Sequence, residues 1–216
     1  MVHRPPTVLL TGFDAFGGEL INPSWLAVKA LHGRQIASHR IITAQLPTVF
    51  DESLIALRAL LMEHRPALTI CVGQAGGRNA MSLERIAINV NDARIADNAG
   101  AQPVDTPVAA GAPAAYFTRL PIKAMWVALQ KEGVPAEVSQ TAGTFVCNHV
   151  FYGLIHFLAT QRGFKHKRGG FIHVPLIPEQ GAPSMPLADM TRGLQIAVRC
   201  ALGTAQDVNV GAGAIQ

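Results

Sequence analysis

Ala67-Leu-Thr-Ile-Cys-Val-Gly73 is an unbroken run of small and apolar residues with a single threonine. Unbroken apolar runs of this length are typical of strands that helices cover on both faces of a parallel sheet. The stretch Gly170-Phe-Ile-His-Val174, which is followed by Pro175, has the same character and predicts a second buried strand. Together the two runs favour an α/β fold.

Strands and helices alternate on either side of these runs. Further strands are predicted over residues 7–11, 36–46 and 136–140, and the alternating stretch 83–90 predicts a hairpin or an extension of the sheet. Helices are predicted to begin at Asn22-Pro23, after a capping box at Thr48-Val-Phe-Asp51, and to span residues 122–131 and 187–203. Residues 97–119 are rich in Ala, Gly and Pro and are expected to form a surface excursion.

The pattern as a whole predicts one domain. At 216 residues, of which 49% are hydrophobic, the chain is long enough to bury a full core. We predict a single three-layer α/β/α domain over residues 1–205, with a mixed, mostly parallel twisted sheet. The small and polar residues 206–216 are expected to form a frayed tail.

The composition also bears on location and partners. No apolar run approaches the roughly 18 residues of a membrane span. The first residues lead directly into a predicted strand without a signal-peptide region, so we expect a cytoplasmic protein that binds no membrane. The net charge of +4 is compatible with a nucleic-acid partner, but the basic residues are scattered apart from Lys165-His-Lys-Arg168. We therefore expect no nucleic-acid partner.

The three cysteines are widely spaced and odd in number, which supports neither a disulfide framework nor a zinc site. We expect no metal and no other cofactor. Cys71 and Cys200 fall on core-facing positions of a predicted strand and a predicted helix, so both are expected to be inert packing thiols. Cys147 has a different setting.

Cys147 follows Ala142-Gly143-Thr144, which breaks the chain ahead of a helix. One face of that helix carries residues at i, i+4, i+7, i+8 and i+11, namely Cys147, Phe151, Leu154, Ile155 and Leu158. The sulfur is therefore predicted in the first turn, where unpaired N–H groups and the helix dipole favour an anion. A cysteine in that position is expected to have a lowered pKa and to act as a nucleophile.

A nucleophilic thiol needs a base, and His173 is the best-placed histidine. It lies at the carboxyl end of a buried strand, where α/β folds gather their working residues. His149 is about 200° around the helix from Cys147 and faces away. Glu84 is the candidate for a third group that orients the imidazole. Two alternatives remain open: His173 as a hydrogen-bonded core histidine, and Glu84 as a salt-bridge partner of Arg85 or Arg94.

Five segments, in order, carry a resemblance to a known family. They are Thr11-Gly-Phe-Asp-Ala-Phe-Gly-Gly18 with Asn22-Pro-Ser-Trp25, Val72-Gly-Gln-Ala-Gly-Gly-Arg78, Glu84-Arg-Ile-Ala-Ile-Asn-Val-Asn-Asp-Ala-Arg94, Ala142-Gly-Thr-Phe-Val-Cys-Asn-His149 and Gly170-Phe-Ile-His-Val-Pro175 with Pro178-Glu-Gln180. The sequence resembles the pyroglutamyl-peptidase I (pyrrolidone-carboxylate peptidase) family. The resemblance implies a Cys–His–Glu triad of Cys147, His173 and Glu84. It further implies removal of an N-terminal pyroglutamyl residue from peptides, and a homo-oligomer, specifically a tetramer. Ala15 departs from the family, which has proline there.

Recognition of a neutral lactam ring calls for a small apolar slot with a few polar contacts. Phe13 and Phe16 are the predicted walls, Gln74 and Asn22 the predicted polar contacts, and Phe145 and Val146 the residues that close the slot. Asn22 has the alternative role of a helix N-cap.

Two donors are candidates for stabilising an oxyanion. One is the backbone N–H of Cys147 at the start of its helix. The other, carried by the family likeness, is Arg94, whose alternative role is to pair with Asp92, Asp97 or Glu84.

Two rival functions differ in class. One is another α/β thiol hydrolase, such as an amidase, that uses the same triad on a different amide. The other is a nucleotide-binding or nucleic-acid-binding module built on the Gly17-Gly18 loop. The loop lacks the lysine and the Ser/Thr of a phosphate-binding motif, which argues against the second rival.

Overall fold

The computed structural model describes residues 5–213, and seven strands form its main sheet. In spatial order they are β2 (Gln35–Ile36), β3 (His39–Leu46), β1 (Thr7–Phe13), β4 (Leu68–Gln74), β9 (Arg168–Val174), β5 (Met81–Glu84) and β8 (Ala136–Ser139). Strands β3, β1, β4 and β9 are parallel, whereas β2, β5 and β8 run in the opposite direction. The predicted mixed, mostly parallel sheet is confirmed.

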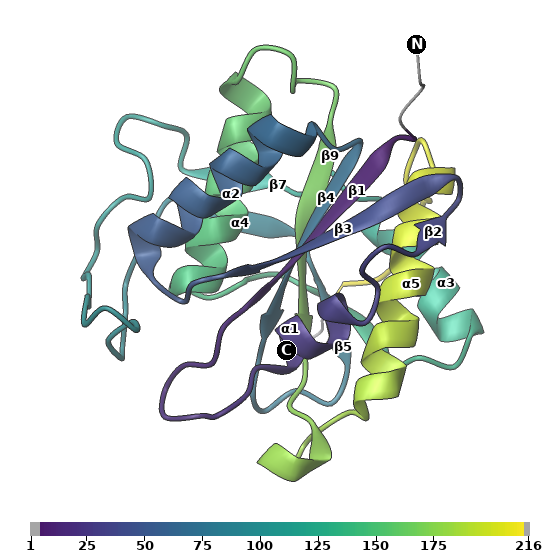
Figure 1. Cartoon of the computed structure of the whole chain (residues 1–216), viewed down its shortest axis with the longest axis horizontal. Helices are drawn as coiled ribbons and strands as arrows, with labels where there is room; N and C mark the ends of the chain where they lie inside the picture. The colour runs from purple at the N-terminus through teal and green to yellow at the C-terminus, as the bar shows by residue number, and fades with distance from the viewer. Residues whose placement is uncertain (1–4, 214–216) are drawn as a thin grey trace.

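Helices cover both faces of this sheet (Figure 1). The helices α2 (Phe50–His64) and α4 (Val146–Thr160) lie on one face. The other face carries α1 (Pro23–Lys29), α3 (Ile122–Lys131) and α5 (Leu187–Gly203). The three-layer α/β/α arrangement is therefore the predicted one. Within the described residues no helix is long and apolar enough to cross a lipid bilayer.

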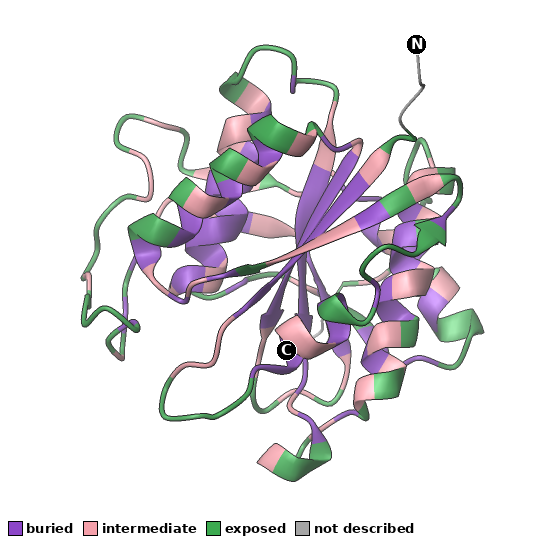
Figure 2. Ribbon diagram, in the orientation of Figure 1, coloured by how far each residue is buried: buried purple, intermediate pink, exposed green. Residues whose placement is uncertain are grey.

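Alternate residues of the central strands fill two separate cores. In β1, Val8 and Leu10 point toward α1 and α5, while Leu9 and Phe13 point toward α2 and α4. Figure 2 shows the resulting buried centre, in which β1, β4 and β9 are almost wholly enclosed. Strands buried on both sides carry apolar residues at successive positions, which explains the unbroken apolar runs of the sequence.

The strand predicted over residues 36–46 is in fact a hairpin. Ala37 and Ser38 adopt φ values of 46° and 63° and turn the chain between β2 and β3. Such turns favour Gly, Asn or Asp because side chains disfavour positive φ. Neither residue belongs to that group, so the turn left no signal in the sequence.

The capping box predicted at Thr48 does not form. The N-cap of α2 is Val49, and it makes no side-chain capping bond. Instead, the N–H of Phe50 donates to Oδ2 of Asp97 at 3.0 Å, and the N–H of Thr48 donates to Oδ1 of Asp14 at 2.7 Å. The carboxylate of Asp97, far away in the sequence, therefore supplies the capping that the local pattern assigned to Thr48, while Asp14 binds the residue before the N-cap.

The alternating stretch 83–90 splits at Arg85. Residues before it complete β5, and residues after it form β6 (Ile86–Ile88), which pairs with β7 (Ala115–Phe117) in a separate two-stranded ladder. The 97–119 excursion is thus irregular except at its end. In the predicted tail, Asp207 accepts hydrogen bonds from the N–H groups of Lys123 and Ala124, and residues 214–216 lie outside the described part. The domain boundary at residue 205 stays a prediction.

Candidate active site

The sulfur of Cys147 lies over the carboxyl ends of β4 and β9. Helix α4 begins at Val146, so Cys147 is in its first turn, as predicted. A Cβ atom at Gly73 would come within 2.7 Å of Sγ of Cys147. Gly73 is paired with His173 in the register of β4 and β9. Paired residues of neighbouring strands present side chains on the same face of the sheet, so the thiol and the imidazole share one face.

His173 and Glu84 form the second contact of the site. Nδ1 of His173 lies 2.7 Å from Oε1 of Glu84, and both side chains are buried. Oε1 also accepts a hydrogen bond from Arg78, as expected of an ionised carboxylate, so Nδ1 carries the proton of this bond. In the neutral ring Nε2 then holds the lone pair and can act as a base. Within residues 5–213, no hydrogen bond links Sγ of Cys147 to His173.

Arg78 is a site residue that the sequence analysis missed. Its Nη1 lies 2.9 Å from Oε1 of Glu84, whose side chain is 0% exposed. In the described part of the chain, the alternatives considered from the sequence, Arg85 and Arg94, make no ion pair with Glu84. Arg78 is the last residue of the motif Val72–Arg78. Nothing in the spacing of that motif connects Arg78 to an acid six residues later, because the direction of the strand that carries the acid cannot be predicted from the sequence.

The prediction of a lowered pKa for Cys147 is wrong. Burial, and to a smaller extent the nearby charge of Glu84, raises the pKa of this thiol to about 12, while Arg78 acts in the opposite direction. The loss of hydration therefore outweighs the favourable end of the helix dipole. In the free protein the proton stays on sulfur, so attack on a substrate requires its transfer to a base.

Aromatic rings gather around Phe145, two residues before Cys147. The ring of Phe145 lies 6.0 Å from that of Phe16 and 5.4 Å from that of Phe50, in an edge contact. Phe16 and Phe145 are half-buried, whereas Phe13 and Val146 are buried. The half-buried pair is placed to act as walls of a slot, and contact with a substrate stays a prediction for all four.

The two predicted polar contacts, Asn22 and Gln74, differ in whether they have a hydrogen-bonding group free to bind a substrate. Asn22 is the N-cap of α1, as its alternative role implied. Its Oδ1 accepts from the N–H and the hydroxyl of Ser24, and its Nδ2 donates to the carbonyl of Asp14. Gln74, in contrast, has a buried Oε1 with no hydrogen-bond partner in the described chain. Gln74 therefore retains an acceptor for a ligand, and substrate binding by Asn22 has no such support.

The two candidate oxyanion donors also differ. The N-cap of α4, Phe145, makes no side-chain hydrogen bond to the first turn, which leaves the N–H of Cys147 available. The side chain of Arg94 is exposed, and within the described residues it forms no ion pair with Asp92, Asp97 or Glu84. Its role as a donor stays a prediction.

The remaining buried histidine and thiols take no part in this constellation. Nδ1 of His149 lies 2.9 Å from Oδ1 of Asn91, and burial lowers the pKa of His149 to about 4. Burial raises the pKa of Cys71 to about 12 and also raises that of Cys200, which is only partly buried. Among residues 5–213, no three His, Cys, Asp or Glu side chains are grouped so that they could hold a metal ion.

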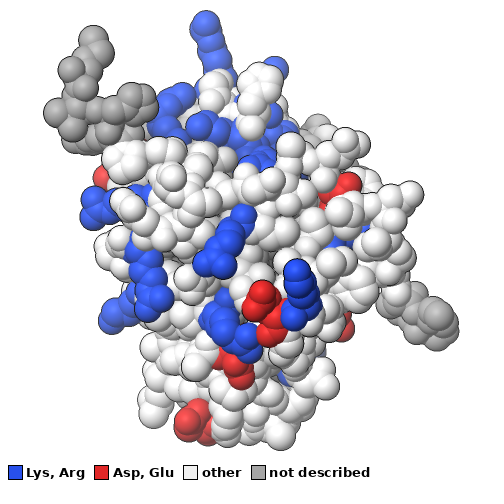
Figure 3. Space-filling view, turned by 90° about the vertical axis from the view of Figure 1, so that its right-hand side faces the viewer, with Lys and Arg blue, Asp and Glu red and all other residues white. Residues whose placement is uncertain are grey.

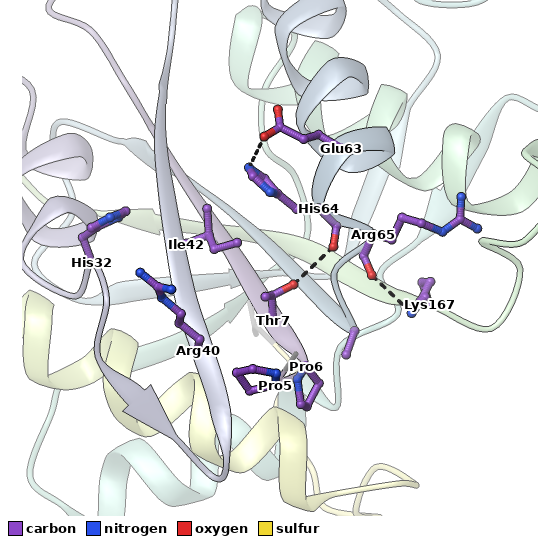
Figure 4. A pocket seen from close by; sticks show the side chains of 11 residues that line it. Pro5, Pro6, Thr7, His32, Arg40, Ile42, Glu63, His64, Arg65 and Lys167 are labelled. Atoms are coloured by element: carbon purple, nitrogen blue, oxygen red, sulfur yellow. Dashed lines mark hydrogen bonds and ion pairs between the residues drawn. The ribbon is translucent and has the colours of Figure 1, made fainter. Parts of the chain in front are cut away.

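Two cavities lie away from the triad. Figure 4 shows the larger, of about 730 Å³, which is lined by Thr7, Arg40 and His64 among others and lies at the amino-terminal edge of the sheet. The smaller, of about 450 Å³, lies beside the start of α2 and includes Asn91 and Thr106. Figure 3 shows several Lys and Arg side chains close together at the upper end of this face, whereas lower down Lys and Arg occupy separate positions with Asp and Glu among them.

Comparison with known proteins identifies the family to which the chain belongs. The family model described as pyroglutamyl peptidase matches residues 6–204. The chain belongs to the pyroglutamyl peptidase family. Pyrrolidone-carboxylate peptidase 1 of Ralstonia nicotianae is 57% identical over 213 residues, which cover 96% of this chain and 98% of that protein.

Solved structures of the pyroglutamyl peptidase family share the whole fold. Pyroglutamyl peptidase I from Bacillus amyloliquefaciens is 52% identical, superposes with a TM-score of 0.93, and covers 96% of this chain and 100% of its own. Pyrrolidone carboxyl peptidase from Thermococcus litoralis is 34% identical with a TM-score of 0.92, and covers 95% of this chain and 99% of its own.

Proposed function

We propose that this chain is a cysteine peptidase that removes an N-terminal pyroglutamyl residue from peptides. Cys147 is the nucleophile, His173 the general base and Glu84 the group that orients the imidazole. The observation that carries the proposal is the position of Cys147 Sγ above Gly73, because the register partner of Gly73 is His173, and His173 is bonded to the buried Glu84. Family membership supports the same reaction.

The reaction follows from the proton positions. As the thiol of Cys147 attacks the carbonyl that joins the lactam ring to the next residue, its proton passes to Nε2 of His173. The N–H of Cys147 stabilises the oxyanion. The carbon–nitrogen bond then breaks, and His173 returns the proton to the leaving amine. Water attacks the thioester while His173 accepts a water proton, and this proton finally restores the thiol as pyroglutamate leaves.

Substrate choice rests on a neutral ring. A pyroglutamyl group has no ammonium, so an acidic subsite for free N-termini would not recognise it. Phe16 and Phe145 supply apolar walls, and the unpartnered Oε1 of Gln74 supplies an acceptor for the lactam N–H. A buried acceptor left unpaired disfavours rings that lack this N–H. Removal of the acceptor in Gln74→Leu is expected to raise KM for a pyroglutamyl amide.

Release of a fluorescent amine tests the proposal directly. A pyroglutamyl amide is compared with its prolyl and glutamyl analogues on wild type, Cys147→Ser and the matched variant Cys200→Ser. We expect turnover of the pyroglutamyl compound alone, lost in Cys147→Ser and retained in Cys200→Ser. No turnover by the reduced, folded wild type would reject the peptidase and favour a thiol hydrolase of another amide. Activity in Cys147→Ser would reject the nucleophile.

A cytoplasmic location and assembly into a homo-oligomer, a tetramer by family resemblance, belong to the same proposal. Large apolar side chains on the surface support assembly, since Leu20 is 94% exposed and Phe117 is 67% exposed. Fractionation of the source cells tests the cytoplasmic location, and the mass in solution tests the oligomeric state.

A further inference from the structure

Glu84 has two partners among the described residues, and both use the same oxygen. Oε1 accepts from Nδ1 of His173 at 2.7 Å and from Nη1 of Arg78 at 2.9 Å, while Oε2 is buried without a partner. The carboxylate itself is 0% exposed, and the side chain of Arg78 is 27% exposed. Arg78 thus reaches the buried acid from the loop between β4 and β5, at the rim of the site.

Two physical consequences follow from this arrangement. A buried carboxylate costs free energy unless cations or hydrogen bonds compensate it, and the guanidinium of Arg78 is the fixed cation that does so here. In addition, two donors that converge on Oε1 hold this oxygen toward the imidazole. With His173 alone as partner, the carboxylate could rotate and present either oxygen.

We propose that Arg78 is a positioning residue of the reaction, which fixes the Glu84 carboxylate against His173 and offsets its charge at the thiol of Cys147. The inference rests on the triad proposed above. Arg78 touches neither the thiol nor the imidazole through any hydrogen bond in residues 5–213, so it acts through Glu84 and through its charge.

The charge of Arg78 also acts on the thiol of Cys147. The groups that bear on the Cys147 thiol are Glu84 from β5, Arg78 from the β4–β5 loop and Cys71 from β4, with His173 on β9 beside it. Glu84 and Cys71 raise the pKa of Cys147, and Arg78 lowers it. Removal of the cation should therefore make the thiol lose its proton only at higher pH.

The experiment compares Arg78→Gln and Arg78→Lys with Arg85→Gln, whose arginine follows Glu84 directly and, in the described part of the chain, makes no ion pair with it. In Arg78→Gln we expect kcat to fall about 10- to 100-fold, because the orienting group is itself misplaced. The rate of Cys147 alkylation by iodoacetamide should fall at each pH, with its profile moved to higher pH. Arg78→Lys should keep the alkylation profile and lose less of kcat. Arg85→Gln should match wild type in both.

The two readouts separate this inference from the proposed peptidase. If wild type fails to cleave the pyroglutamyl amide, the function is rejected, while the alkylation profiles still decide the role of the Arg78 charge. A thermal melt accompanies each variant. Arg78→Gln that is less stable but has wild-type kcat and alkylation profile would be a structural variant only and would overturn the inference. Equal profiles of Arg78→Gln and Arg78→Lys, both shifted, would also overturn it, since retained charge should rescue the thiol.

Discussion

At the residue scale, the site depends on the absence of one side chain. Gly73 leaves the space that Cys147 Sγ occupies, because a Cβ there would lie 2.7 Å from the sulfur and 2.9 Å from the ring of Phe171. We expect Gly73→Ala to displace the thiol, to lower kcat by about 100-fold and to cost about 1–3 kcal/mol in the free energy of unfolding. Steady-state kinetics measure kcat, and denaturant unfolding measures the free energy of unfolding.

Gly76→Ala is the matched control for this change. Its added Cβ would meet only Leu176, at 3.9 Å, which is an ordinary contact. A Gly73→Ala enzyme as active as Gly76→Ala would show that the sulfur does not need its observed position.

The raised pKa of Cys147 gives a second prediction at the residue scale. Because the pKa lies near 12, the thiolate fraction rises about tenfold for each pH unit across the neutral range. We expect the iodoacetamide rate of wild type, after subtraction of the rate of Cys147→Ser, to increase steadily from pH 6 to pH 9. A plateau reached below pH 8 would restore the low pKa that the helix position alone predicts. Cys71 should stay unlabelled in the native protein.

Residue-scale inference from the sequence selected Cys147, His173 and Glu84 as the candidate triad but did not predict their electrostatics. The bases for choosing Cys147, His173 and Glu84 were helix phase, strand ends and family motifs, which are local properties. The burial of Glu84 and its pairing with Arg78 depend on how β5 packs between β9 and β8. A balance between desolvation and a helix dipole is a property of the folded environment, so it cannot be predicted from local sequence patterns.

At the element scale, α2 is held by a carboxylate from the distant loop at residues 97–101. Oδ2 of Asp97 accepts from Phe50, and Oδ1 accepts from Ala99 and Ala101. Since both oxygens are acceptors, Asp97→Asn loses at least one of these bonds. We expect a loss of about 1–3 kcal/mol in the free energy of unfolding. Asp92→Asn, at an exposed carboxylate, should change it by less than about 0.5 kcal/mol. Equal stability of the two variants would contradict this capping.

His149 on α4 makes the stability of the fold depend on pH. Its pKa is lowered from 6.5 to about 4, so the neutral ring is favoured in the folded state. The corresponding stability is fully present above pH 6.5 and is lost as the pH falls toward 4. Asp51 favours the charged ring and Arg58 disfavours it. The loss amounts to about 3 kcal/mol at most.

The test is the free energy of unfolding of wild type and His149→Gln between pH 7 and pH 4. The variant should be less stable at pH 7 and should have the flatter slope below pH 6.5. His166→Gln, at an exposed histidine, should keep the slope of wild type. A wild-type slope in His149→Gln would assign the acid sensitivity to other groups.

Element boundaries show which signals a sequence carries. The predicted helix over 122–131 has the observed bounds, and the last helix was placed at its observed residues, because both have an apolar stripe with clear ends. The β2–β3 turn at Ala37 and Ser38 and the cap from Asp97 were missed. The turn depends on a backbone conformation that Ala and Ser rarely adopt, and the cap depends on a tertiary contact.

At the scale of the whole molecule, one reversed strand shapes the site. The alternation of strands and helices predicts a parallel sheet with chemistry at the carboxyl ends, and His173 obeys this rule. Glu84 lies on β5, which runs antiparallel to β9, and its carboxylate is hydrogen-bonded to His173 on that neighbouring strand. The direction of a short strand after a glycine-rich loop is not encoded in its own residues. The fold class could therefore be predicted, but the path that brings Arg78 to the rim of the site could not.

The family resemblance implies four chains, and the described surface carries isolated large apolar side chains at Leu20 on the β1–α1 loop and at Phe117 on β7. Phe117 also lies on a strand with a single neighbour, β6, so its other edge presents unpaired backbone groups. Light scattering should give a mass of about four times 23.0 kDa. Leu20→Ser and Phe117→Ser locate the contact, since a variant at the interface should shift the mass downward. A wild-type mass equal to one chain would remove the oligomer from the proposed function and leave its chemistry intact, because every group of the triad belongs to a single chain.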